Sequence, residues 1–124
     1  MLVHQHLIIR AEVKNPPTDE EFTKNWLTEL VNKIGMKIVS GPHAKYVSKE
    51  GNEGMTGVVI IETSHCAIHV WDRANPPLIQ LDVYTCSCMD INTVFEHMSV
   101  FEPTKVEYKY LDRETGLKLV DESN

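Results

Sequence analysis

The sequence predicts an α+β fold, a two-layer sandwich in which a mainly antiparallel sheet carries two helices on one face. Two kinds of pattern support this prediction: segments that alternate apolar and polar residues, and two segments whose apolar residues recur with helical period. The segments follow one another as βαβ, then a hairpin, then αβ. At 124 residues and 42% hydrophobic, the chain is expected to form one domain over residues 1–124.

The first segments predict a strand followed by a helix. Residues 2–13 alternate as a half-buried strand does. After Asn15-Pro16-Pro17, Thr18 with Glu21 three residues later is typical of a capping box that opens a helix. Gly35 follows where a left-handed helix cap belongs. The apolar stripe of this helix is formed by Phe22, Trp26, Leu27, Leu30, Val31 and Ile34.

The middle of the chain predicts further strands. Residues 36–40 are expected to form a short strand, and residues 41–54, which mix Gly, Pro, Lys, Glu and Asn, an exposed loop. The β-branched run at 57–61 is typical of a central strand buried on both faces. Residues 66–71 and 78–86 predict an antiparallel hairpin around a polar, Pro-containing turn.

The last third predicts a second helix and two strands. Asp90 is placed to cap the helix, and Pro103 ends it. Alternation with period two returns over residues 105–110, and Leu117 to Val120 is expected to add a short strand. The apolar stripe of the helix is formed by Ile91, Val94, Phe95, Met98 and Phe101.

Composition excludes several classes of partner. Eighteen acidic and twelve basic residues give a net charge of −6, and the basic residues are scattered, which argues against nucleic acid and anionic membrane as partners. No apolar run approaches the roughly 20 residues that span a bilayer, and the N-terminus lacks a signal-peptide pattern. Three cysteines without a disulfide framework fit a reducing compartment. A cytoplasmic location is therefore expected.

Potentially reactive side chains are most concentrated in residues 62–71 and 82–86, where hydroxyls, imidazoles and thiols lie on two neighbouring predicted strands. Three interpretations are open: a serine nucleophile beside a histidine, a Cys/His metal site, and ordinary strand residues, which is the commonest fate of such side chains. A G-x-S-x-G nucleophile elbow is missing. A metal site is disfavoured because no paired ligand spacing is present and alternation places Cys66 opposite two of the histidines. The donors considered are His65, Cys66, His69, Cys86 and Cys88.

Two motifs resemble a known family. Ser64-His65-Cys66-Ala67-Ile68-His69-Val70-Trp71 and Asp82-Val83-Tyr84-Thr85-Cys86 are similar to the S-H-x-x-I-H-x-W and D-V-[FY]-T-C signature of bacterial and archaeal S-adenosylmethionine decarboxylases. Thr56-Gly57-Val58-Val59-Ile60 is similar to the small hydroxyl residue and Gly-Val-Val strand of that family. The order of elements agrees over residues 1–112. The resemblance implies a two-layer α+β sandwich, a proenzyme that cleaves itself, and a homodimer.

The resemblance also implies roles for individual residues. The Ser64 hydroxyl would attack the carbonyl of Thr63, and elimination of the resulting ester would leave a pyruvoyl group, the cofactor, at residue 64. His69 matches a histidine that assists this processing, and Thr56 matches a hydroxyl residue near the oxyanion. Cys86 matches the proton donor that acts after the substrate amine has formed a Schiff base with the pyruvoyl ketone.

The implied substrate is S-adenosylmethionine, in spermidine biosynthesis. Trp71, Asp72 and Tyr84 are the candidate substrate-binding residues, and Tyr46 is a further aromatic residue for stacking on adenine, although aromatic residues commonly serve a core. The family carries Trp-Pro-Glu, whose Glu holds the ribose hydroxyls, where this chain has Trp71-Asp72-Arg73. That departure keeps a sister decarboxylase acting on ornithine or arginine as an alternative.

The bond expected to break also departs from the family. The family has Glu-Ser, whereas this chain has Thr63-Ser64 with Glu62 one place earlier. An uncleaved, non-catalytic binding or regulatory relative is therefore a third hypothesis. Ser64 and His69 are five residues apart and would face opposite sides of an unbroken strand, so a turn or bulge is expected at residues 63–65. His4 and His6 share a strand face, where a solvated edge is expected rather than a metal site.

Overall fold

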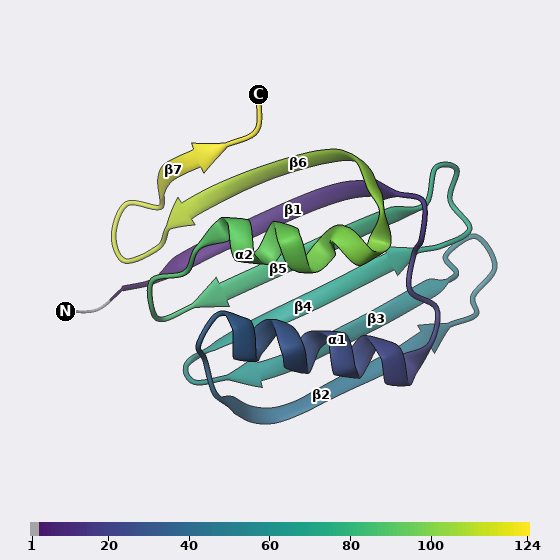
Figure 1. Ribbon diagram of the computed structural model, residues 1–124, viewed down its shortest axis with the longest axis horizontal. Coiled ribbons are helices and arrows are strands. Elements are labelled where there is room, and N and C mark those ends of the chain that lie inside the picture. Colours follow the sequence, from purple (N-terminus) through teal and green to yellow (C-terminus); the bar gives the residue numbers. More distant parts are fainter. Residues whose placement is uncertain (1–2) are drawn as a thin grey trace.

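The computed structural model describes residues 3–124 and has a seven-stranded antiparallel sheet in the order β2-β3-β4-β5-β1-β6-β7. Both helices lie over one face of this sheet, which confirms the predicted fold class (Figure 1). No helix among the described residues has the length and apolar character to cross a membrane. The elements are β1 (Gln5–Val13), α1 (Glu20–Lys33), β2 (Ile38–Val47), β3 (Gly54–Ile61), β4 (Ser64–Trp71), β5 (Leu78–Thr85), α2 (Ile91–His97), the 3₁₀-helix η1 (Met98–Phe101), β6 (Pro103–Asp112) and β7 (Lys118–Glu122).

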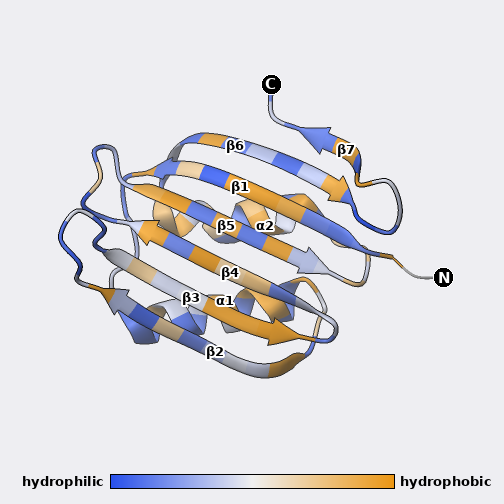
Figure 2. Cartoon of the chain, turned by 180° about the vertical axis from the view of Figure 1, so that it is seen from behind, coloured by the Kyte–Doolittle hydropathy of each residue, from blue (hydrophilic) through white to orange (hydrophobic). Residues whose placement is uncertain are grey.

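The core lies between the sheet and the helices. In β1 the alternation predicted from the sequence is confirmed, with Leu7, Ile9, Ala11 and Val13 all buried. The opposite face of the sheet carries no helix, and hydrophilic and hydrophobic residues are interspersed along the strands (Figure 2). We call this surface the free face.

The first helix begins one residue later than the capping box suggested. Asp19 is the N-cap, and its carboxylate accepts a hydrogen bond from the backbone N–H of Glu21 at 3.2 Å, so the prediction of Thr18 as the cap is wrong. Gly35 follows the helix with a φ of +76°, which confirms the left-handed cap.

Phe22 does not join the apolar stripe of α1. Thr23 takes the core-facing position of the first turn, where α1 crosses β3 at Gly57. Because successive residues turn by about 100° around a helix, Phe22 then points toward solvent and is 42% exposed. The other predicted stripe residues, Trp26, Leu27, Leu30, Val31 and Ile34, are buried or nearly so.

The exposed loop predicted for residues 41–54 is wrong for most of its length. β2 runs through it to Val47, and only residues 48–53 connect it to β3. β2 is an edge strand, which tolerates Pro42 because one side of the ladder needs no N–H donor. Register shifts between Ile38 and His43 absorb the irregular backbone.

β3 is not buried on both faces as predicted. Its residues alternate, and Val58 and Ile60 lie on the free face at 36% and 46% exposure. The reason is that the two helices cover only one side of the sheet. The apolar run in β3 therefore supplies both the core and part of the free face.

The second helix and the C-terminal strands follow the predictions closely. The Asp90 carboxylate accepts from the N–H of Asn92 at 2.9 Å and caps α2, whose last turn tightens into η1 before β6. β6 and β7 contain the predicted segments 105–110 and most of 117–120. β7 lengthens the sheet beyond β6 and is exposed along its length.

The helices are joined by a reciprocal contact between Trp26 and His97. The Trp26 indole N–H donates to the His97 carbonyl at 3.0 Å, His97 Nε2 donates to the Trp26 carbonyl at 2.8 Å, and the rings stack with centroids 4.5 Å apart. Lys33 Nζ donates to His97 Nδ1 at 3.2 Å, so the imidazole is neutral. Burial lowers the pKa of His97.

We predict that acid weakens the fold through His97. The unfolded chain, in which histidine keeps its ordinary pKa of 6.5, binds a proton more readily than the folded chain. The contribution is therefore complete above pH 6.5 and is lost as the pH falls below that value. Urea unfolding between pH 7.5 and 5 should report this loss. His97→Gln should be about 1–2 kcal/mol less stable at pH 7.5 and have a shallower pH dependence. An equally steep dependence in the variant would contradict the assignment.

Candidate active site

A two-residue turn, Glu62 and Thr63, connects β3 to β4. Thr63 has a φ of +53°, the left-handed region that β-branched residues avoid. Holding an L-residue there costs roughly 1–2 kcal/mol. The strained residue thus provides the carbonyl of the Thr63–Ser64 bond.

Three side chains donate hydrogen bonds to the carbonyl oxygen of Glu62 in this turn. Thr63 Oγ1 lies 2.8 Å from it, Ser64 Oγ 3.0 Å and Cys86 Sγ 3.1 Å. Ser64 begins β4 and Cys86 follows the end of β5, so antiparallel pairing of these strands brings the two together. Two of the four predicted catalytic residues therefore meet at one carbonyl group.

The other two predicted catalytic residues, Thr56 and His69, form a separate pair. They are cross-strand partners on β3 and β4, with Thr56 Oγ1 3.2 Å from His69 Nδ1. The β3–β4 ladder has no register shift between Ser64 and His69, so His69 lies about 16 Å along β4 from Ser64. Ser64 faces the helices and His69 the free face. The expected distortion is thus a turn before Ser64, and it does not bring these two side chains together.

The predicted substrate-binding residues are divided in the same way. Trp71 and Asp72 lie at the His69 end of β4, where the His69 and Trp71 rings are 6.4 Å apart. Tyr46 donates to both carboxylate oxygens of Asp72, at 2.9 and 3.1 Å. Tyr84 lies at the Ser64 end of the sheet, two residues before Cys86.

The predicted residues therefore fall into two groups within one chain. We call them the Ser64 group and the His69 group. The Ser64 group contains Thr63, Ser64, Tyr84 and Cys86, and the His69 group contains Thr56, His69, Trp71 and Asp72.

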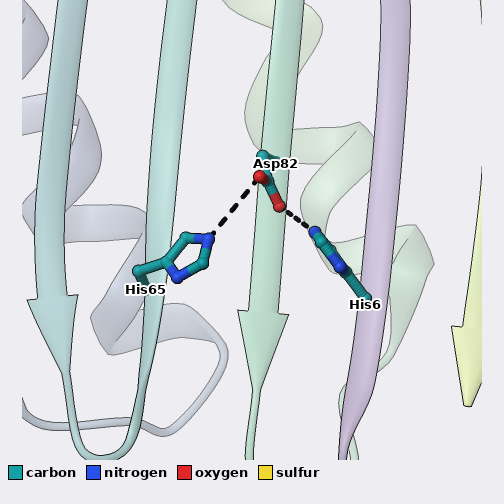
Figure 3. A group of neighbouring side chains, drawn as sticks. All are labelled: His6, His65 and Asp82. Carbon is teal, nitrogen blue, oxygen red and sulfur yellow. Dashed lines mark hydrogen bonds and ion pairs between the residues drawn. The ribbon is translucent and has the colours of Figure 1, made fainter. Parts of the chain in front are cut away.

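Sequence reasoning missed a polar cluster on the free face. His6 of β1 and His65 of β4 approach Asp82 of β5 from opposite sides (Figure 3). His6 Nε2 is hydrogen-bonded to one carboxylate oxygen of Asp82, and His65 Nε2 lies 3.5 Å from the other. Burial raises the pKa of Asp82, but His6 and then His65 more than offset this effect, so its pKa lies below the ordinary value.

The cluster continues through Arg113 to the end of β6. Arg113 Nη1 donates to His6 Nδ1 at 3.0 Å, and the guanidinium lies 4.1 Å from the centroid of the Tyr84 ring. The His6 ring nitrogen that accepts from Arg113 carries no proton, so the proton lies on Nε2 and is directed to Asp82. Arg113, His6, Asp82 and His65 therefore form a continuous polar chain, which we call the Asp82 array.

The thiols and imidazoles considered for a metal site are spread over both faces of the sheet. Cys66 is buried on the helix side, opposite His65 and His69, as alternation predicted. Burial raises the pKa of its thiol to about 12, so it stays protonated at neutral pH. Cys66 therefore packs as a small apolar side chain.

Comparison with known proteins gives consistent matches. A family model described as S-adenosylmethionine decarboxylase matches residues 5–114. The S-adenosylmethionine decarboxylase proenzyme of Archaeoglobus fulgidus is 28% identical over 119 residues, which cover 91% of this chain and 99% of the relative. That of Thermodesulfovibrio yellowstonii is 32% identical over 83 residues, which cover 65% and 57%. In fold, the crystal structure of the adenosylmethionine decarboxylase from Aquifex aeolicus is similar, with a TM-score of 0.71 and 23% identity over 99% of this chain and 98% of that one.

We predict that Thr63→Gly stabilises the uncut chain. Glycine adopts a positive φ without steric cost, and the gain is partly offset by its greater freedom in the unfolded state. In a Ser64→Ala background, which keeps the chain whole, the free energy of unfolding in urea should rise by about 0.5–1 kcal/mol. Thr63→Ala keeps Cβ and should give a smaller gain. Because both variants lose the hydrogen bond from Thr63 Oγ1 to the Glu62 carbonyl, a Thr63→Gly protein no more stable than Thr63→Ala would mean that the turn is not strained.

Proposed function

Because the chain belongs to the S-adenosylmethionine decarboxylase family, we propose that it is a proenzyme that cleaves itself between Thr63 and Ser64 and then decarboxylates S-adenosylmethionine in spermidine biosynthesis. One observation carries this proposal: the Ser64 hydroxyl and the Cys86 thiol meet at a turn in which Thr63 is strained. The hydroxyl adjoins the bond to be cut, and the thiol is close enough to serve the group formed there.

Cleavage of the bond uses only atoms of the chain, and formation of the ketone that follows consumes one water molecule. After rotation about χ1 away from the Glu62 carbonyl, Ser64 Oγ attacks the carbonyl carbon of Thr63, and the amide becomes an ester as the Ser64 nitrogen takes up a proton. Removal of the Ser64 α-proton then expels the Thr63 carboxylate and leaves a dehydroalanine. Its imine tautomer takes up water and loses ammonia, which gives the pyruvoyl group. Breaking the bond releases the strain at Thr63.

The residues at the turn fit a pyruvoyl cofactor. A serine supplies its carbon skeleton, and a neighbouring thiol supplies a proton donor. The pyruvoyl ketone supplies an electron sink for loss of carbon dioxide. Cys86 returns a proton to the substrate α-carbon, and Tyr84, Trp71 and Asp72 bind the substrate. Tyr46 fixes the orientation of the Asp72 carboxylate toward the ribose hydroxyls.

The separation of the two groups supports a homodimer. Ser64 and His69 are too far apart in one chain for His69 to take the α-proton directly. A second copy brings its own His69 group to the Ser64 group of the first, and symmetry completes both sites. The free face, with exposed Ile8, Val58 and Ile60, suits such a contact. The three unpaired thiols fit a cytoplasmic enzyme.

The proposal predicts two fragments from the wild-type chain. Intact mass should give residues 1–63 and residues 64–124, the second with a blocked N-terminus, together with release of labelled carbon dioxide from S-adenosylmethionine. Ser64→Ala should stay whole and lose more than about 10³-fold of the activity, because no cofactor forms. Cys86→Ser should still be cut but turn over slowly, since a serine hydroxyl is a far weaker acid than a thiol.

The same measurements separate the alternatives. Release of carbon dioxide from ornithine or arginine instead of S-adenosylmethionine would support a sister decarboxylase. A wild-type chain that stays whole for days would support a non-catalytic relative. Turnover by a whole chain would contradict the cofactor proposed here.

A shared site predicts complementation between two inactive variants. Ser64→Ala and His69→Asn should each be inactive alone, and the mixed dimer should contain one site in which Ser64 and His69 are both intact. With random pairing, about a quarter of the wild-type number of sites is restored. Carbon dioxide release from co-expressed, doubly tagged chains measures this. A mixture that stays inactive would indicate that each site is built within one chain.

A further inference from the structure

Cutting the chain before Ser64 creates a new chain end at residue 64. This residue carries the cofactor after the cut and must therefore be held in a fixed position. Thr63 is the covalent neighbour that holds residue 64 in the uncut chain, and cleavage removes it. Chain ends fray unless they are tied down. The backbone of His65 is paired with β3 and β5, and because residue 64 gives up its side-chain hydroxyl when the cofactor forms, His65 is also the first residue whose side chain can tie this end down.

His65 is attached to the sheet through the Asp82 array. Its Nε2 lies 3.5 Å from Asp82 Oδ2, and the other carboxylate oxygen is held by His6. Arg113 fixes His6 in turn at 3.0 Å. Arg113 is itself secured, since its backbone N–H donates to the carbonyl of His4 at 2.8 Å. The array therefore connects the first side chain after the cut to β5, β1 and the end of β6.

From this arrangement we infer that the Asp82 array is a clamp that holds the new chain end, with His65 and Asp82 as positioning residues for the group formed at residue 64. The inference rests on the self-cleavage proposed above. The array touches neither the hydroxyl nor the carbonyl that react, so it leaves cleavage itself unaffected. Its importance begins once the Thr63–Ser64 bond is gone.

A divalent metal ion is the other occupant that two imidazoles and a carboxylate suggest. The contact from Arg113 argues against it. A guanidinium always donates, so His6 Nδ1 accepts and the proton lies on Nε2, the atom that a metal would need unprotonated. Direct hydrogen bonding through Asp82 satisfies the same atoms without an ion.

The deciding experiment compares Asp82→Asn with the unchanged Asp82 protein twice, once in self-cleaved protein and once in protein that stays whole. Asp82→Asn keeps the size of the side chain and removes its charge. Hydrogen exchange of the amides of residues 65–69 is followed in the self-cleaved protein and in the Ser64→Ala background, which stays whole. In cleaved protein we expect exchange about tenfold faster, as for loss of a charge-assisted hydrogen bond, and in whole protein a change within about twofold.

Two further variants sharpen the comparison. Glu107→Gln removes another carboxylate of the free face, whose partner Arg10 lies 3.0 Å away, and should leave exchange in residues 65–69 unchanged. His65→Gln keeps a donor N–H that reaches Asp82 and should retain most of the protection, whereas His65→Ala should lose it. The cleaved Asp82→Asn protein should also have a lower kcat with a smaller change in KM, because the group at residue 64 is less well positioned.

Each result has a distinct meaning. Equal acceleration in cut and whole protein would reduce the array to an ordinary sheet contact and overturn the inference. Failure of Asp82→Asn to cleave would overturn it as well, because the array would then act before the cut. Binding of one Zn²⁺ per chain, lost in His6→Ala, would replace the clamp by a metal site. If the intact mass shows that wild-type protein stays whole, the proposed self-cleavage is contradicted, and the clamp, which rests on it, is contradicted as well.

Discussion

The alternation of side chains along β4 determines how this protein is organised. Residues at even spacing share one face of a strand and residues at odd spacing do not. Ser64 therefore faces the helices, five positions before a histidine that faces away from them. A single chain cannot bring the two together without breaking the strand, and the ladder to β3 runs through this segment without a register shift. The division into a Ser64 group and a His69 group, and with it the case for a second copy, follows from this one constraint.

Strain at the β3–β4 turn is maintained because both neighbouring strands are firmly paired. β4 lies between β3 and β5, so its first residues cannot shift to relax Thr63 without breaking hydrogen bonds on two sides. The left-handed residue costs roughly 1–2 kcal/mol, which is small beside the ladders that enforce it. Three donors to the Glu62 carbonyl further fix the turn. A hydroxyl, a strained peptide and a thiol from the end of the neighbouring strand β5 are thereby held together at one turn.

Local patterns in the sequence predicted most elements because each is amphipathic in its own right. The stripe from Trp26 to Ile34 and the alternation from Leu7 to Val13 mark their buried faces. The strand predicted at residues 36–40 covers only the start of β2, and the rest was missed because an edge strand accepts Gly41, Pro42 and polar residues that a central strand excludes. The motif around Ser64 and Cys86 predicted two candidate site residues, and the structure brings them together because β4 and β5 are neighbours both in the sequence and in the sheet. The Asp82 array was beyond local reasoning, because His6 meets Asp82 only through the insertion of β1 beside β5.

That insertion also explains how the sheet can be cut near its middle and stay whole. The proposed cleavage before Ser64 would leave β1, α1, β2 and β3 in one piece and β4, β5, α2, β6 and β7 in the other. In the sheet, however, β1 of the first piece lies between β5 and β6 of the second, so strands of the two pieces alternate across the sheet (Figure 1). Separation would break the β1–β5, β1–β6 and β3–β4 ladders together. In a sheet ordered as in the sequence, the same cut would leave only one ladder between the halves. The topology thus allows the backbone to be broken next to the strained Thr63 while the core, which spans both pieces, remains closed.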